Sequence, residues 1–444
     1  MSPEEALAFL HGLYRPGAKP PTSLARVREL LRRLGHPELG LRTVHITGTN
    51  GKGSVAATVA EIMRAAGHRT GLFISPYLER FGERVVFDGR ELPDEALVSF
   101  VPRIRAAVAG MTAAGWDAPA EFEAVTALAA LYYQREAADV VSLEAGLGGR
   151  LDATNAIPGS LVSVITRVGL DHVDRLGPTV ADIAREKADI IRPGGPVVAG
   201  RLRPEPLAVI TGAAAARRAQ LVLLGRDFDY TLHSSGLDGL RLTVRGRLAS
   251  YDGLHFPLLG EHQADNLACA VAAVECAAER GLPVTPEAIR AGAAAVRWPA
   301  RLEILSSTPT VILDGAHNPD AIEALAASLR ALFGRQGRRL VAVVGALGDK
   351  ATEAMFASLL PLVDELVVTT PSFAARAMPA ERLAALVRDQ YPELPVRSVP
   401  DIRDAVCAGL SLVGPRDLLL VTGSFYLVGD ARRHLRELLG FVSP

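Results

Sequence analysis

The chain has 444 residues, with 48 basic and 49 acidic side chains and a formal net charge of −1. This balance argues against a broad electrostatic surface for nucleic acid or for an anionic membrane. No apolar run approaches the roughly 20 residues that span a bilayer, and the N-terminal segment lacks the pattern of a secretory signal. The three cysteines show no zinc spacing. We therefore expect a cytoplasmic α/β protein of two or three domains that binds neither nucleic acid nor membranes. We also expect a monomer, although composition does not bear on the oligomeric state.

The first 300 residues alternate short β-branched runs with longer alanine- and leucine-rich helical patterns, which is typical of parallel α/β units. Strands are predicted at 43–47, 69–74, 139–143 and 161–166, and helices at 53–66, 93–114, 121–137 and 261–280. Between 221 and 257 the apolar residues alternate over short runs, which predicts a small antiparallel sheet.

The segment 297–301 (RWPAR) predicts a domain junction, because proline interrupts both helix and strand there. Beyond it, further strands are predicted at 311–313, 340–346, 365–370, 396–399 and 418–423. We therefore predict two domains. Residues 1–297 would form a P-loop ATPase-like domain with a mostly parallel sheet and a small antiparallel subsheet, and residues 298–444 a Rossmann-like domain.

Residues 45–54 read HITGTNGKGS and lie between a predicted strand and a predicted helix. In that context glycines let backbone N–H groups approach phosphate oxygens, and Lys52 can reach the outer phosphates. The alternative is a glycine-rich turn that caps an ordinary helix. The generic phosphate-loop pattern would place glycine at Ile46 and a hydroxyl at Gly53, and here the hydroxyl comes one place later, at Ser54.

These departures select a subclass, because GTNGKGS resembles the ATP loop of the Mur ligase superfamily. Its GKGS ending resembles the folate branch, which contains the folylpolyglutamate and dihydrofolate synthases. Further segments match this branch in order: SPYLERFGERVV (75–86), EAGLGGRLDATN (144–155), GLDH (169–172), REKAD (185–189), DGAHNP (314–319) and GSFY (423–426). One departure is Tyr77, which stands where the branch usually has histidine.

The resemblance implies three sets of site residues. ATP would be bound by Thr49, Asn50, Gly51, Lys52, Gly53, Ser54, Asn266, Arg301 and Asp314. Two Mg²⁺ ions would be held by Ser54, Ser75, Glu144 and His172, and by Lys187 if its amine carries CO₂, with K⁺ as a further candidate cation. The pteroate or folate substrate and glutamate would be contacted by Ser75, Tyr77, Phe122, Glu123, Leu151, Asp152, Ala153 and His317.

Read without the resemblance, several of these residues have ordinary structural interpretations. Glu144 ends a predicted strand, where doubly wound sheets place metal-binding carboxylates, but it could be a solvated strand end. A lone histidine such as His172 is more often structural than a ligand. Asn266 could be a polar residue near a helix N-terminus, and His317 part of a simple turn.

Lysine is rare in this chain and occurs only at positions 19, 52, 187 and 350. From composition alone Lys187 is a surface helix residue. In related ligases the equivalent lysine carries CO₂ as N6-carboxylysine, whose carboxylate supports a magnesium ion. Arginine could not replace it there, because a guanidinium stays protonated in proteins.

The resemblance therefore implies an ATP-dependent ligase that adds L-glutamate to dihydropteroate, to reduced folates, or to both, through an acyl phosphate. Lys52, His172 and Lys187 would be its catalytic residues, and a bifunctional enzyme is favoured over a folylpolyglutamate synthase alone. A cell-wall Mur ligase would need a UDP-binding domain, and only about 40 residues precede the first predicted strand. A P-loop GTPase or ATP-binding switch would need an Asn-Lys-x-Asp motif, which the sequence lacks.

Overall fold

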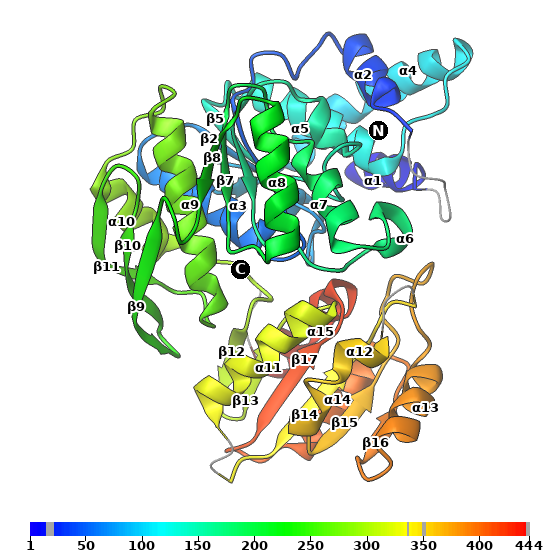
Figure 1. The fold of residues 1–444 in the computed structure, drawn as a ribbon. Helices are drawn as coiled ribbons and strands as arrows, with labels where there is room; N and C mark the ends of the chain where they lie inside the picture. The colour runs from blue at the N-terminus through cyan, green and yellow to red at the C-terminus, as the bar shows by residue number, and fades with distance from the viewer. Residues whose placement is uncertain (15–21, 335–336, 349–351, 441–444) are drawn as a thin grey trace.

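The computed structural model describes residues 1–14, 22–334, 337–348 and 352–440, so Lys19 and Lys350 lie outside the described residues. The chain forms two α/β bodies, each built on its own sheet (Figure 1). A third, small sheet packs on the outside of the first body. The α/β fold class predicted from the sequence is confirmed.

The first body contains an eight-stranded sheet with the order β4-β3-β2-β5-β1-β6-β7-β8. Its strands are β1 (Thr43–Thr47), β2 (Thr70–Phe73), β3 (Val85–Phe87), β4 (Arg90–Glu91), β5 (Val140–Glu144), β6 (Ser160–Ile165), β7 (Pro196–Ala199) and β8 (Gln220–Leu223). All neighbours from β2 to β8 are parallel, and β3 and β4 add an antiparallel edge. The central strands β1 and β5 are buried along their whole length, as expected for a sheet that is covered on both faces.

Helices cover both faces of this sheet. One face carries α3 (Lys52–Ala65), α9 (His262–Ala278) and α10 (Pro286–Ala295), with the antiparallel sheet of β9 (Asp229–Gly236), β10 (Gly239–Arg245) and β11 (Ser250–Phe256) in the same hydrophobic core. The other face carries α1 (Pro3–His11), α2 (Ala25–Arg33), α4 (Asp94–Ala113), α5 (Glu121–Arg135), α7 (Val180–Ala188) and α8 (Pro204–Ala216). The short α6 (Val173–Leu176) precedes α7.

The predicted antiparallel region is partly wrong. Its first strand, β8, pairs in parallel with β7 and extends the large sheet. The antiparallel pairing is confined to β9, β10 and β11. Local alternation cannot assign β8 to a sheet, because the strand partner lies more than twenty residues away in sequence.

Of the described helices, α4 alone is long and apolar enough to pass a length and composition test for a membrane span. Its apolar window is 44% buried inside the protein. The helix packs against α1, α2 and α5, and its buried residues belong to their shared core. Because a core helix passes the same test, α4 is weak evidence for a membrane span.

The second body has a six-stranded sheet with the order β12-β13-β17-β14-β15-β16. Its strands are β12 (Glu303–Ser307), β13 (Thr310–Leu313), β14 (Leu340–Val344), β15 (Glu365–Val368), β16 (Val396–Ser398) and β17 (Leu418–Thr422). Its helices are α11 (Pro319–Phe333), α12 (Thr352–Phe356), α13 (Ala380–Gln390), α14 (Ile402–Leu412) and α15 (Phe425–Leu438). The pairings are parallel except that β12 runs antiparallel to β13, and two hydrophobic clusters cover the two faces.

Loops at the carboxyl ends of strands in both sheets contribute to one shared cavity. In the first sheet they follow β1, β2, β5, β6 and β7, and in the second they follow β13 and β17. Open α/β sheets bind ligands at this edge. The two bodies therefore present their binding edges to each other.

Candidate functional site

The cavity between the two sheets has an empty volume of about 1470 Å³, part of which is open to solvent. Fourteen of the predicted site residues line it: Thr49, Asn50, Gly51, Lys52, Gly53, Ser54, Ser75, Glu144, His172, Lys187, Asn266, Arg301, Asp314 and His317. Residues up to 268 positions apart in sequence thus meet in one place.

The phosphate loop leads into α3, whose first turn has no side-chain cap. By contrast, Asn318 and Ser424 cap α11 and α15 through their side chains. An uncapped helix start leaves backbone N–H groups free for an anion, and the helix dipole favours negative charge there. Glycine is required at position 51, because φ is +87° and a Cβ would lie 2.4 Å from Asn266 Oδ1.

The two cavity lysines converge on the phosphate loop. Lys52 Nζ donates hydrogen bonds of 3.1 Å to the carbonyls of Gly48 and Thr49. Lys187 Nζ donates to the same Gly48 carbonyl at 2.8 Å. Burial, together with the charge on Lys52, lowers the pKa of Lys187 to about 7. A substantial fraction of Lys187 is therefore a neutral amine near neutral pH.

Glu144 is a buried acidic group that lines the same cavity as the two lysines. Its side chain is 4% exposed, and burial raises its pKa to about 7, although Lys52 opposes the shift. The backbone N–H of Ser75 donates to Glu144 Oε2 at 3.3 Å. A cation bound beside Glu144 would favour its ionised form.

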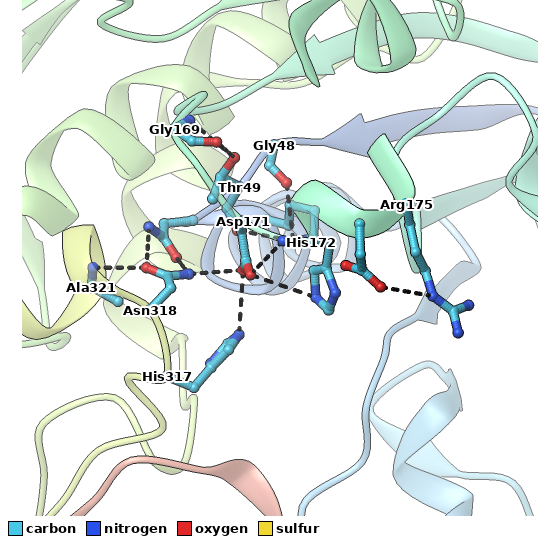
Figure 2. Close-up of polar contacts among 12 residues, drawn as sticks. Gly48, Thr49, Gly169, Asp171, His172, Arg175, His317, Asn318 and Ala321 are labelled. Carbon is cyan, nitrogen blue, oxygen red and sulfur yellow. Dashed lines mark hydrogen bonds and ion pairs between the residues drawn. The ribbon is translucent and has the colours of Figure 1, made fainter. Parts of the chain in front are cut away.

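Asp171 holds together groups from both bodies (Figure 2). Its carboxylate accepts a 3.0 Å hydrogen bond from Asn318 Nδ2, and it lies 3.8 Å from His172 Nε2 and 3.9 Å from His317 Nε2. Asn318 also exchanges two amide hydrogen bonds, of 3.0 and 3.1 Å, with Asn50 of the phosphate loop. The conformation of the phosphate loop is thereby tied to the second body.

Arg301 and Asp314 connect the junction to the cavity. The guanidinium of Arg301 lies 4.5 Å above the ring of Phe425, in a cation–π contact. The Asp314 carboxylate accepts hydrogen bonds from the N–H groups of Leu302 and Ala316, at 2.9 and 2.8 Å. Asp314 therefore links Leu302, just before β12, to Ala316, just after β13.

The start of α9 forms another wall of the cavity. Asn266 Nδ2 donates to Gln263 Oε1 at 2.8 Å, which fixes the orientation of both amides. Burial lowers the pKa of the neighbouring His262 to about 4, so this ring is neutral at physiological pH. Neutral amides and a neutral imidazole suit an uncharged heterocycle such as a nucleotide base.

Six residues predicted to contact the pteroate or folate substrate do not line this cavity: Tyr77, Phe122, Glu123, Leu151, Asp152 and Ala153. Phe122 borders it, because a Cβ on the cavity residue Gly146 would lie 2.6 Å from the ring. The Glu123 carboxylate is bonded to Arg26 at 2.7 Å and to the Ala120 N–H at 2.7 Å. Their substrate contacts stay predictions.

Around Tyr77 the surroundings are aromatic and basic. The Arg84 guanidinium lies 5.2 Å from the Tyr77 ring, and Phe81 lies 6.1 Å away. Burial raises the pKa of the Tyr77 phenol, which therefore stays protonated. Its ring and hydroxyl replace the histidine usual at this position without adding a group that titrates near neutral pH.

Asp171 and Phe425 line the cavity and lie inside the motifs GLDH and GSFY, but no role is predicted for either from the sequence. Asn318 lies in the matched motif DGAHNP, next to the predicted site residue His317. Gln263 and His262 lie in the helix start that supplied Asn266. Their position within matched motifs was the available signal. The contacts of Asp171 with the second body could not be read from sequence.

Comparisons with known proteins agree with this geometry. Residues 300–425 match the family model "Mur ligase, glutamate ligase domain". The chain is 36% identical to the folylpolyglutamate synthase of Lacticaseibacillus casei over 98% of this chain and 99% of the relative. It is 34% identical to the dihydrofolate synthase/folylpolyglutamate synthase of Bacillus subtilis (strain 168), with coverage of 98% and 99%.

Solved structures show the same likeness. The Mycobacterium tuberculosis folylpolyglutamate synthase complexed with ADP superposes with a TM-score of 0.90, at 34% identity, over 100% of this chain and 99% of that chain. A structure described as an FPGS–AMPPCP–folate complex gives a TM-score of 0.83 at 36% identity, with coverage of 98% and 100%. The chain therefore belongs to the folylpolyglutamate synthase and dihydrofolate synthase family of ATP-dependent ligases.

Proposed function

We propose that this enzyme joins L-glutamate to dihydropteroate and to reduced folates, with hydrolysis of ATP to ADP and phosphate. The observation that carries the proposal is the convergence of Lys52, Glu144, His172 and Lys187 on one cavity between the two sheets. The bifunctional assignment is supported by the name of the B. subtilis relative, which includes both activities. The L. casei relative is named for one of them, so a folylpolyglutamate synthase alone is the alternative.

The reaction would proceed in two displacements. The substrate carboxylate attacks the γ-phosphorus of ATP, which forms an acyl phosphate and releases ADP. The amine of glutamate then attacks the acyl carbonyl, loses a proton, and displaces phosphate to leave an amide. Lys52 and the N–H groups at the start of α3 would stabilise charge on the phosphoryl oxygens. His317 and Asp171, whose side chains lie 3.9 Å apart, would position the reactants at the edge of the second sheet.

The cavity residues suit a magnesium site in which the ATP phosphates supply part of the coordination. The described residues contain no group of three or more His, Cys, Asp or Glu side chains that could hold a metal alone. Mg²⁺ commonly binds through one or two carboxylates together with substrate phosphates. We propose that Glu144, His172, Ser54 and Ser75 hold two Mg²⁺ ions with the ATP phosphates, where the metal would offset phosphoryl charge. No observation here favours K⁺, which stays a prediction.

We further propose that Lys187 carries CO₂ as N6-carboxylysine. Carboxylation requires a neutral amine, and a pKa lowered to about 7 supplies one at physiological pH. The amine nitrogen attacks CO₂, forms an N–C bond, and loses a proton to give the carbamate. Proton-decoupled ¹³C NMR in ¹³C-bicarbonate should show a carbamate signal that is absent from Lys187→Arg. An identical spectrum for both proteins would contradict the assignment.

Several predictions about the whole molecule go with this function. We propose that residues 1–297 bind ATP and the pteroate or folate substrate, and that residues 298–444 form the glutamate ligase domain. The enzyme would act on small molecules as a cytoplasmic monomer. A sedimentation experiment at micromolar concentration would test the oligomeric state.

A coupled assay of phosphate release tests the function directly. The expected result is ATP turnover that requires both glutamate and either dihydropteroate or a tetrahydrofolate. Activity with both acceptors would support the bifunctional enzyme, and activity with the tetrahydrofolate alone would support the alternative. ATP turnover that ignores both acceptors would indicate a nucleotide-dependent switch and would contradict the proposal.

A further inference from the structure

A chain of buried hydrogen bonds runs from the centre of the large sheet to Asp152. His45, on β1, and Thr154 are both 0% exposed, and His45 Nε2 lies 2.8 Å from Thr154 Oγ1. Thr154 Oγ1 is also hydrogen-bonded to Asp152 Oδ1. None of the three side chains lines the cavity, and His45 and Thr154 have no part in the function described so far.

The carboxylate at the end of this chain shapes the cavity wall. Asp152 Oδ2 accepts a 2.8 Å hydrogen bond from the N–H of Leu147, and Oδ1 accepts one of 3.0 Å from the N–H of Thr154. Leu147 lies in the turn Gly146–Gly148, which lines the cavity immediately after Glu144. The orientation of Asp152 therefore fixes the backbone between the metal-ligand candidate Glu144 and the candidate substrate residues.

The directions of these hydrogen bonds follow from the donors. The two backbone N–H groups can only donate, so the Asp152 carboxylate accepts from both. It accepts a third bond from the Thr154 hydroxyl, whose oxygen is then free to accept from His45 Nε2–H. This assigns the Nε2–H tautomer to His45 and leaves Nδ1 as a lone pair, for which the described residues provide no partner. Burial lowers the pKa of His45 to about 3, so the ring stays neutral.

We propose that His45 and Thr154 are positioning residues for glutamate ligation, which hold Asp152 in the one orientation that braces the Gly146–Gly148 turn. The inference rests on the proposed function. His45 lies three residues before Gly48, so β1 supports the phosphate loop directly and the turn after Glu144 through these side chains. Without the Thr154 hydroxyl, the buried Asp152 carboxylate loses one hydrogen-bond donor and must rotate or recruit water. Either change moves the Gly146–Gly148 turn. A displacement of about 1 Å in a reacting geometry can cost about 100-fold in rate.

The test separates the Thr154 hydroxyl from the Thr154 methyl group. Thr154→Val keeps the shape and removes the donor, whereas Thr154→Ser keeps the donor. Thr70→Val is the matched control, because Thr70 is 3% exposed and its hydroxyl donates to the His68 carbonyl at 2.9 Å, at the start of β2. For Thr154→Val we expect kcat/KM for the pteroate or folate substrate to fall about 10- to 100-fold. We expect Thr154→Ser and Thr70→Val to stay within about threefold of wild type, and the Kd for ADP to change little in all three.

The outcomes separate this inference from the proposed function. If wild type ligates glutamate and Thr154→Val matches it in kcat and KM, the positioning role is wrong. It is also wrong if Thr154→Ser fails as badly as Thr154→Val, because the hydroxyl would then not be the cause. If Thr154→Val does not fold, His45→Gln against His45→Leu asks the same question, and equal activity in that pair would overturn the inference. A wild-type enzyme without glutamate-dependent turnover would instead refute the proposed function.

Discussion

We predict that the buried carboxyl group of Glu144 lowers the free energy of unfolding at neutral pH. Burial raises the pKa of Glu144 from 4.5 to about 7, so between these pH values the folded protein binds the proton that the unfolded chain has lost. The free energy of unfolding therefore falls as the pH rises through this window, and the loss is complete above pH 7. Glutamine has the same shape without the charge, so Glu144→Gln should escape this loss.

The magnitude follows from the shift. A pKa raised from 4.5 to about 7, at about 1.4 kcal/mol for each unit, corresponds to roughly 3.5 kcal/mol. Because the side chain is only 4% exposed, solvent screening reduces this little. We expect Glu144→Gln to gain about 3 kcal/mol over wild type between pH 4.5 and pH 8, measured by urea unfolding with EDTA and without nucleotide. We also expect this stabilised variant to lose about 100-fold or more in kcat, since Glu144 is proposed to hold metal.

Glu393→Gln provides the control, because Glu393 is exposed in a loop and its removal should leave the pH dependence unchanged. If the stability curves of wild type and Glu144→Gln run parallel from pH 4.5 to 8, Glu144 titrates normally in the folded protein. The reasoning from burial would then be refuted. The loss of activity alone would not rescue it.

Three further predictions test other parts of the molecule. In buffer without CO₂ or bicarbonate, Lys187 is a free amine whose pKa falls from 10.5 in the unfolded chain to about 7 in the folded protein. The folded protein then binds fewer protons, so stability should rise with pH between these values, and urea unfolding in the same buffer should show that Lys187→Met removes the rise. Arg432 pairs with Glu79 of the first body and donates hydrogen bonds of 2.9–3.0 Å to Glu303. Arg432→Met should therefore cost about 2–3 kcal/mol in thermal unfolding, and an unchanged stability would mean that solvent replaces the pair. Asn318→Asp keeps the cap of α11 but faces Asp171 with a second carboxylate, so steady-state kinetics should show KM for ATP raised about tenfold; an unchanged KM would mean that this contact does not hold the cavity closed.

The sequence predicted most of the parallel strands because they are short, apolar and buried on both faces. β1 and β13 begin and end within a residue of the predicted ranges. β12 was not predicted: Glu303–Ser307 is an edge strand of half-buried and exposed residues, so it carries no continuous apolar run. The partner of β8 was missed for a different reason, since strand pairing is decided by tertiary contact.

For the site too, the sequence predicts which residues take part but not which of them contact each other. Motif order predicted fourteen residues that the fold brings to one cavity, because parallel strands place their following loops at one edge. It could not show that Asn50 pairs with Asn318, or that Glu123 is already bonded to Arg26. Such contacts depend on the angle between two bodies and on rotamers, neither of which leaves a periodic signal.

Burial shifts the pKa values of four charged groups that line the cavity toward their neutral forms, acids and bases alike. The pKa values of Glu144 and Asp314 are raised, and those of Lys187 and Arg301 are lowered. Burial therefore makes each of these groups less stable as an ion than it would be in water. A triphosphate would compensate the cations, and a metal ion would compensate the carboxylates. Substrate binding should then stabilise these ions and with them the folded protein, which explains why charges of both signs are buried where the two sheets meet.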